Sequence, residues 1–172
     1  MSVKIIVYMH ITANGMIARL DGSEFSSKKA RQGFQDMMAK VNVNIVGRNT
    51  FEMSKKNGSF PMKGLNIVIT SHKIKNSFGK DVIITNSNPK KILEIVEKRG
   101  YKEAAVGGGV TAANFLKEGL VNEIFLDIEP IIFGRGIPVF AYEKFEKKLK
   151  LIDTKRISNN EIRLHYKVLQ NK

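Results

Sequence analysis

Three consecutive glycines stand between an apolar segment, residues 104–106, and a stretch from Thr111 to Glu118 that has the composition of a helix. Glycine lacks a Cβ atom, so this turn can adopt positive φ angles and lets a ligand approach the backbone closely. The helix that follows offers unpaired N–H groups and the positive end of its dipole, which both favour an anion. A phosphate cradle is one interpretation, and a turn that only ends a strand is the other. The candidate cradle residues are Gly107, Gly108, Gly109, Val110 and Thr111.

A second turn with phosphate-binding chemistry follows the apolar segment at residues 43–46. Arg48 can donate a fork of hydrogen bonds to a phosphate, and Asn49 and Thr50 add neutral donors. The alternative is that Arg48 is a surface cation and Thr50 a helix cap. The candidate residues of this turn are Gly47, Arg48, Asn49 and Thr50.

A third polar group ends the apolar run at residues 65–70. Thr70, Ser71, His72 and Lys73 bring together two hydroxyls, an imidazole and an ammonium group. These groups suit a phosphate such as the 2′-phosphate of NADP, and a polar loop of ordinary turn residues is the alternative interpretation.

The spacing of apolar residues predicts strands that alternate with helices. Val3 to His10 is typical of a buried strand, Ile11 to Gly22 of a loop, and a helix is expected from Ser26 or Ser27 to Lys40. Asn88-Pro89 opens a helix that ends before Gly100. Further strands are expected at residues 43–46, 65–70, 82–85, 104–106, 123–128, 148–157 and 161–169, and further helices after residue 47 and at 111–118.

This order predicts an α/β fold with a mostly parallel sheet, and the turn at residues 158–160 indicates an antiparallel hairpin at its end. Ligands of such sheets bind outside the carboxyl ends of the strands. The turns at Gly47 and Gly107 are therefore expected at the same edge, where they could hold two parts of one phosphorylated ligand.

The composition excludes several classes of site and of cellular location. The 172 residues fit one domain, residues 1–172, and the absence of cysteine excludes disulfides and thiolate sites. His10, His72 and His165 lie far apart in sequence, so no metal site is expected. The amino-terminal segment lacks the features of a signal peptide, and no segment is long and apolar enough to span a membrane, which favours a cytoplasmic protein.

The net charge of +13 raises the possibility of a polyanionic ligand. The lysines are scattered, and no aromatic cluster alternates with them, so solvated surface lysines are favoured over a nucleic-acid interface. A basic module that binds nucleic acid or a nucleotide remains the alternative outside enzymes.

Several segments resemble known families when they are taken together and in order. Residues 12–18, TANGMIA, resemble the first loop of dihydrofolate reductases, and the turns described above resemble later segments of the same superfamily. The tail is similar to the riboflavin-biosynthesis reductase family, which includes the reductase domain of bifunctional deaminase-reductases and stand-alone relatives. The matching segments are residues 46–52, 66–71 and 106–109, and the tail pattern covers residues 121–140.

The resemblance implies a dihydrofolate-reductase-like three-layer sandwich that binds NADPH. It implies that the adenosine phosphates contact residues 47–50 and 70–72, that the pyrophosphate lies against residues 107–111, and that the nicotinamide lies near Ala13 and Asn14. In this family, hydride moves from NADPH to a ribosylaminopyrimidine phosphate. The resemblance also implies a homodimer, formed through the carboxyl-terminal strands.

The chain departs from both families in its candidate acids. Many riboflavin reductases have Ser-x-Asp-Gly in the first loop, where this chain has Thr12-Ala13-Asn14-Gly15. The first long helix has no acid where folate reductases carry theirs, so dihydrofolate or pterin reduction is the less favoured enzyme activity. Asn14, Asp21 and Glu24 are the candidates for the catalytic group, although Asp21 also suits a turn and Glu24 a solvated charge.

Overall fold

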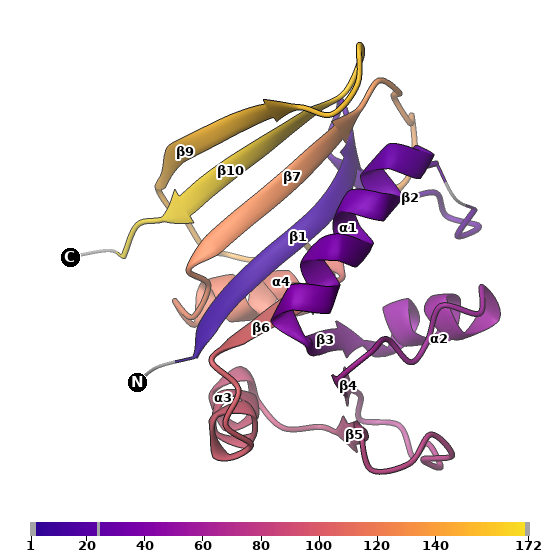
Figure 1. Cartoon of the computed structure of the whole chain (residues 1–172), viewed down its shortest axis with the longest axis vertical. Coiled ribbons are helices and arrows are strands. Elements are labelled where there is room, and N and C mark those ends of the chain that lie inside the picture. Colours follow the sequence, from indigo (N-terminus) through magenta and orange to yellow (C-terminus); the bar gives the residue numbers. More distant parts are fainter. Residues whose placement is uncertain (1–2, 24, 171–172) are drawn as a thin grey trace.

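The computed structural model describes residues 3–23 and 25–170. Its main sheet has the strand order β5-β4-β3-β6-β1-β7-β10-β9 (Figure 1). The strands from β5 to β7 pair in parallel, and β10 pairs antiparallel with both β7 and β9. The strands are β1 (Lys4–Thr12), β3 (Val43–Gly47), β4 (Leu65–Ile69), β5 (Val82–Thr85), β6 (Glu103–Gly107), β7 (Glu123–Glu129), β9 (Leu149–Arg156) and β10 (Ile162–Val168).

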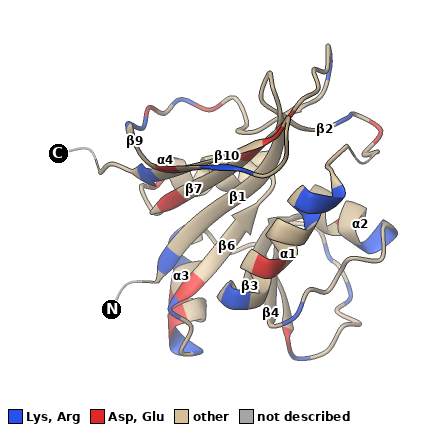
Figure 2. Cartoon of the chain, turned by 45° about the horizontal axis from the view of Figure 1, so that its top comes forward, with Lys and Arg blue, Asp and Glu red and all other residues tan. Residues whose placement is uncertain are grey.

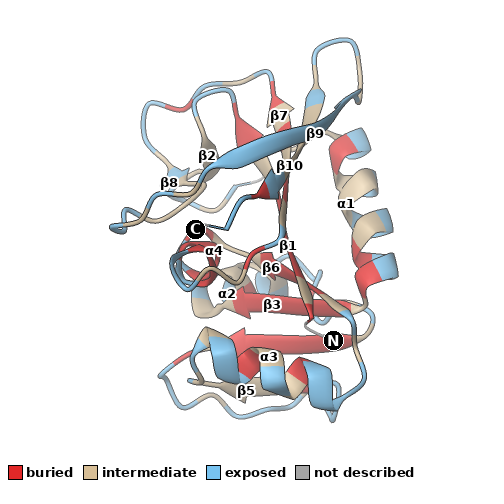
Figure 3. Cartoon of the chain, turned by 90° about the vertical axis from the view of Figure 1, so that its left-hand side faces the viewer, coloured by how far each residue is buried: buried red, intermediate tan, exposed pale blue. Residues whose placement is uncertain are grey.

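Helices cover both faces of this sheet, as the side view shows (Figure 3). The helices α3 (Pro89–Lys98) and α4 (Gly109–Lys117) enclose the larger core, in which Ile92 and Phe115 pack with the sheet residues Val7 and Ile45. On the opposite face, α1 (Lys28–Val41) places Met38 and Val41 against Ile6 and Ala105. The predicted α/β class, the three layers and the antiparallel carboxyl-terminal hairpin are confirmed.

Local sequence signals fix two helix starts as expected. The Ser27 hydroxyl accepts a hydrogen bond from the Ala30 N–H at 3.1 Å and caps α1. The Asn88 side chain accepts from the Lys91 N–H at 2.9 Å and caps α3. Each side chain satisfies one of the N–H groups that a helix leaves unpaired at its start.

The predicted loop at residues 11–22 is wrong in two places. The strand β1 continues to Thr12, and a short strand β2 (Met16–Ala18) pairs with β8 (Ile137–Pro138). The reason is tertiary, because the partner strand lies about 120 residues away and leaves no local signal. The helix α4 also begins at Gly109, two residues before the predicted start.

The helix α2 (Arg48–Lys56) follows β3 directly, and its Phe51 packs with Val46 and Val68. Lysine and arginine lie on α1, α2 and α3 and are not confined to one element (Figure 2). Within residues 3–23 and 25–170, no helix combines the length and apolar character needed to cross a bilayer.

Candidate active site

The turns after β3 and β6 touch each other at the carboxyl edge of the sheet. The two strands are parallel neighbours, with Val46 paired to Gly107. A Cβ atom added to Gly108 would lie 2.5 Å from the Thr50 hydroxyl oxygen, and one added to Gly47 would lie 2.8 Å from that of Thr111. The glycine of each turn therefore makes room for the threonine of the other turn.

This contact brings the amino-terminal ends of α2 and α4 to one place. Gly108 has φ 88° and ψ 134°, a conformation that residues with a Cβ rarely adopt. Gly47 and Gly108 cap the two helices without a side-chain hydrogen bond, so the first N–H groups remain available to a ligand. Two helix dipoles and two hydroxyl groups thus converge, which suits a doubly charged phosphate group.

The other predicted cradle residues differ in their surroundings. Gly109 is buried, and its carbonyl accepts a hydrogen bond from the Ala141 N–H at 3.1 Å, so it contacts the segment after β8. Val110 is exposed, and Asn49 is exposed at the start of α2. The Arg48 guanidinium is partly exposed and lies 3.5 Å from the Glu52 carboxylate, one helical turn away.

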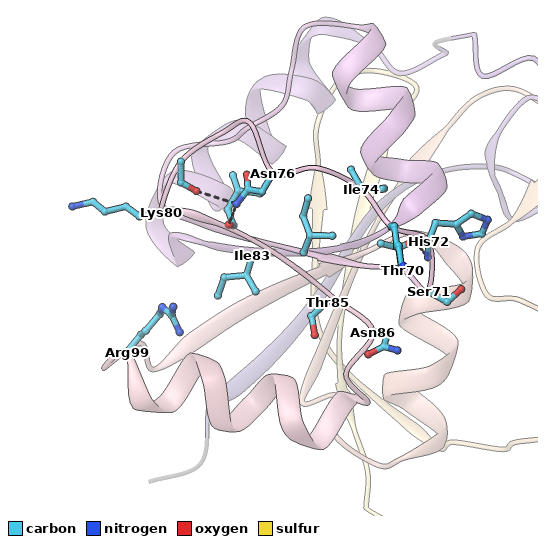
Figure 4. A pocket seen from close by; sticks show the side chains of 14 residues that line it. Thr70, Ser71, His72, Ile74, Asn76, Lys80, Ile83, Thr85, Asn86 and Arg99 are labelled. Atoms are coloured by element: carbon cyan, nitrogen blue, oxygen red, sulfur yellow. Dashed lines mark hydrogen bonds between the residues drawn. The ribbon is translucent and has the colours of Figure 1, made fainter.

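A pocket of about 730 Å³ lies between β5 and the segment after β4 (Figure 4). Thr70, Ser71 and His72 line one end, and Lys80 and Arg99 line the other. The Thr70 hydroxyl is buried and accepts from the His72 N–H at 3.0 Å, which fixes the turn, while the side chains of Ser71 and His72 are exposed. The pocket is basic, as an anionic ligand requires.

The first loop is anchored by the side chain of Asn14. Its Oδ1 accepts from the Thr12 hydroxyl at 2.7 Å, and its Nδ2 donates to the Phe133 carbonyl at 2.7 Å. Ala13 is exposed, and its N–H donates to the Ile131 carbonyl at 2.9 Å. Asn14 thereby joins the end of β1 to the segment after β7.

Of the other two candidates for the catalytic group, Asp21 is exposed and lines a second pocket of about 460 Å³. Hydrogen bonds from Ser23 lower the pKa of Asp21, so it is ionised at neutral pH. Arg19 and Arg135 line the same pocket, and the Arg19 guanidinium lies 4.6 Å from the centre of the Phe133 ring. Glu24 lies outside the described residues.

Sequence reasoning missed a group of buried polar side chains beneath α1. The Asp127 carboxylate is 1% exposed and accepts from the Tyr8 hydroxyl at 2.6 Å and from the Arg163 guanidinium at 2.6 and 2.8 Å. Arg163 also donates to the Tyr8 hydroxyl. Burial, and then the hydrogen bond to Asp127, raises the pKa of Tyr8 far above its ordinary value, so the phenol keeps its proton.

The same face continues toward the carboxyl ends of β1 and β7. His10 Nδ1 lies 2.9 Å from the Ser26 hydroxyl, and burial lowers the pKa of His10. Glu129 is 3% exposed and accepts from the Ser27 N–H at 3.0 Å. The one signal in the sequence is alternation, because polar or ionisable residues recur at every second position in the carboxyl-terminal parts of β1 and β7 and from residue 161 to 165. These residues are Tyr8, His10, Thr12, Asp127, Glu129, Glu161, Arg163 and His165.

Among the described residues, no three His, Asp or Glu side chains are grouped as a metal ion requires. The family model for the RibD C-terminal domain matches residues 3–162. The chain belongs to this family.

Relatives of this RibD C-terminal domain match it along nearly its whole length. An uncharacterised protein of Bacillus subtilis, YwjB, is 27% identical over 170 residues, which cover 95% of this chain and 97% of YwjB. A putative riboflavin biosynthesis protein from Shewanella sp. PV-4 superposes with a TM-score of 0.85 at 24% identity, covering 99% of this chain and 100% of that chain.

Two further solved structures share the fold of this domain. The diaminohydroxyphosphoribosylaminopyrimidine deaminase/5-amino-6-(5-phosphoribosylamino)uracil reductase of Thermotoga maritima has a TM-score of 0.76 at 18% identity, over 98% of this chain and 57% of that chain. Dihydrofolate reductase from Enterococcus faecalis, in complex with NADP(H), has a TM-score of 0.73 at 16% identity, over 99% of this chain and 100% of that chain.

Proposed function

We propose that this protein is an NADPH-dependent reductase. The observation that carries the proposal is the contact between the Gly47 and Gly108 turns, which directs two helix amino termini and the hydroxyls of Thr50 and Thr111 to one point. A mononucleotide phosphate needs only one such turn. Two turns, with a basic pocket beside them, suit a dinucleotide with phosphates at several positions.

The residues present fit NADPH along the carboxyl edge of the sheet. The pyrophosphate would bind at the starts of α2 and α4, and the 2′-phosphate would bind at Ser71, His72 and Lys73. The nicotinamide would then lie near Ala13 at the end of β1. When bound, the cofactor supplies hydride, and the protein supplies alignment and a proton.

Titration with NADPH tests this proposal directly. The Arg48→Ala variant is expected to bind NADPH about tenfold more weakly, because a charged hydrogen bond to phosphate contributes about 1.5–3 kcal/mol. Lys56→Ala removes an exposed positive charge at the other end of α2 and is the matched control, which is expected to bind as the wild type does. Absence of any thermal shift of the wild type with NADPH would refute the proposal.

The substrate we propose is a small phosphorylated or pyrimidine-type molecule, such as 5-amino-6-(5-phosphoribosylamino)uracil. Family membership supports this class, and the pocket lined by Arg19 and Arg135 suits an anionic group. NADPH oxidation in the presence of this compound is the assay. Dihydrofolate serves as the comparison substrate, and we expect no turnover, because residues 30–32 of α1 carry no acid that could bind and polarise the pterin ring from this helix.

A further inference from the structure

The interface between α1 and the sheet changes character along the helix. Near the carboxyl end of α1, Met38 and Val41 pack on apolar sheet residues. Near its amino end, the sheet presents Tyr8, Asp127 and Glu129, which are all at least 97% buried. Burying charged and polar groups costs free energy that apolar side chains of similar size would not, so this half of the interface calls for a functional explanation.

Strand register arranges these side chains in rows. His10 pairs with Asp127 and then Arg163, and in the next row Thr12 pairs with Glu129. The chain passes directly from Thr12 to Ala13 and Asn14, where we propose that the nicotinamide lies. Glu129 is therefore the buried carboxyl in the row nearest the proposed hydride donor.

Glu129 differs from Asp127 in its partners. Arg163 and Tyr8 satisfy Asp127, whereas Glu129 accepts a hydrogen bond from the Ser27 N–H. The antiparallel pairing of Ile128 with Ile162 places a second carboxyl, that of Glu161, next to Glu129. Glu161 Oε2 is buried and has no hydrogen-bond partner among the described residues. A second carboxyl nearby disfavours the ionised form of Glu129 and raises its pKa.

We propose that Glu129 is the proton donor of the reduction and that Glu161 is the positioning residue that keeps it protonated. The inference rests on the proposed function and names a substrate class, molecules with a reducible C=O or C=N bond. When bound, the reduced nicotinamide would supply the hydride that forms a C–H bond with the carbon of that group. The π electron pair moves to its oxygen or nitrogen, which takes the proton from the Glu129 O–H bond and leaves a carboxylate that water reprotonates.

The surroundings of Glu129 support this role. Burial is the largest cause that raises its pKa, and the Glu161 and Asp127 carboxyls add to it, against the opposing hydrogen bond from Ser27. Other charged or titratable groups face this region from each neighbouring element. They are Tyr8 and His10 on β1, Asp127 on β7, Glu161 and Arg163 at β10, and Arg31 on α1. Lys155 on β9 also belongs to this set, because it pairs with Arg163.

The test uses protein labelled with carbon-13 at the glutamate carboxyl carbons, titrated by NMR. We expect one carboxyl to titrate well above the exposed glutamates. Glu129→Gln is expected to remove that signal, Glu161→Gln to shift it to lower pH, and the exposed Glu118→Gln to leave it unchanged. An absence of any elevated carboxyl, or its persistence in Glu129→Gln, would overturn the inference.

Titration of the complexes then separates a catalytic carboxyl from one that is only structural. The oxidised nicotinamide ring is cationic and the reduced ring is neutral, so NADP⁺ should lower the pKa of Glu129 relative to NADPH. Identical titrations in both complexes would contradict the role at the nicotinamide. Failure of the wild type to bind NADPH would instead refute the proposed function, and with it the proton-donor role.

Discussion

Gly108→Ala gives the sharpest test of the two-turn site. The added Cβ would lie 2.5 Å from the Thr50 hydroxyl oxygen, which is closer than non-bonded atoms approach, and the residue has φ 88°. Alanine in this region costs about 1–3 kcal/mol. The Thr50 hydroxyl can rotate away from the new methyl group, but it then leaves the position in which it faces the proposed phosphate.

The matched control is Gly100→Ala, at the end of α3. Gly100 has φ 79°, and a Cβ added there meets nothing within 4 Å. The positive φ angle is expected to lower the unfolding free energy of both variants, and the comparison with and without NADPH is made within each variant. Only Gly108→Ala is expected to weaken NADPH binding, by about 10- to 100-fold, which corresponds to one lost hydrogen bond to a charged group.

Urea unfolding with and without NADPH measures both effects in one experiment. Ligand at 100 times its dissociation constant stabilises a protein by about 2.7 kcal/mol, and a tenfold loss of affinity reduces this to about 1.4 kcal/mol at the same concentration. Gly100→Ala should retain the full increment. If Gly108→Ala gains as much stability from NADPH as Gly100→Ala does, the assignment of the Gly108 turn to the cofactor is wrong.

Further predictions concern other parts of the molecule. Gly33→Ala in α1 should destabilise the protein by about 1–3 kcal/mol in urea unfolding despite the better helix propensity of alanine, because its Cβ would lie 2.6 Å from the Arg163 guanidinium. Lys73→Ala should weaken NADPH binding about two- to fivefold and leave NADH binding unchanged in calorimetry. Burial lowers the pKa of His10 below its ordinary value of 6.5, so the unfolded state binds more protons than the folded state. The free energy of unfolding should therefore fall as the pH drops below about 6.5, and it should fall less steeply in His10→Asn. The homodimer stays a prediction, and size-exclusion chromatography should give twice the chain mass for the wild type. The Leu151→Glu variant, changed on the exposed strand β9, should elute at the mass of one chain.

The features that could be predicted from the sequence are those with local causes. Asn88 and Ser27 cap helices because their side chains reach N–H groups three residues away, and the apolar runs of β3 and β4 need no distant partner to be recognised. The two glycine turns could be predicted for the same reason, since each glycine and the helix that follows it are adjacent in the chain.

The buried polar face could not be predicted in this way, because it depends on register. His10 alternates with apolar neighbours as any half-exposed strand residue does, and Asp127 and Arg163 lie 36 residues apart. Only the pairing of β1 with β7 and of β7 with β10 places them in one row. The β2–β8 pair was missed for the same physical reason.

Partner satisfaction separates the two buried carboxyls of this face, Asp127 and Glu129. The charge of Asp127 is met by Arg163 and Tyr8, and hydrogen bonds of this kind position α1 on the sheet. Glu129 has no cation among its described partners, and its neighbour Glu161 keeps one buried oxygen without a partner. A network built only to hold the helix gains nothing from an incompletely satisfied carboxyl pair, since each such group lowers stability. A carboxyl that must give up a proton and take one back needs this arrangement, which is why we assign the chemistry to the Glu129 end of the face and the support of α1 to the Asp127 end.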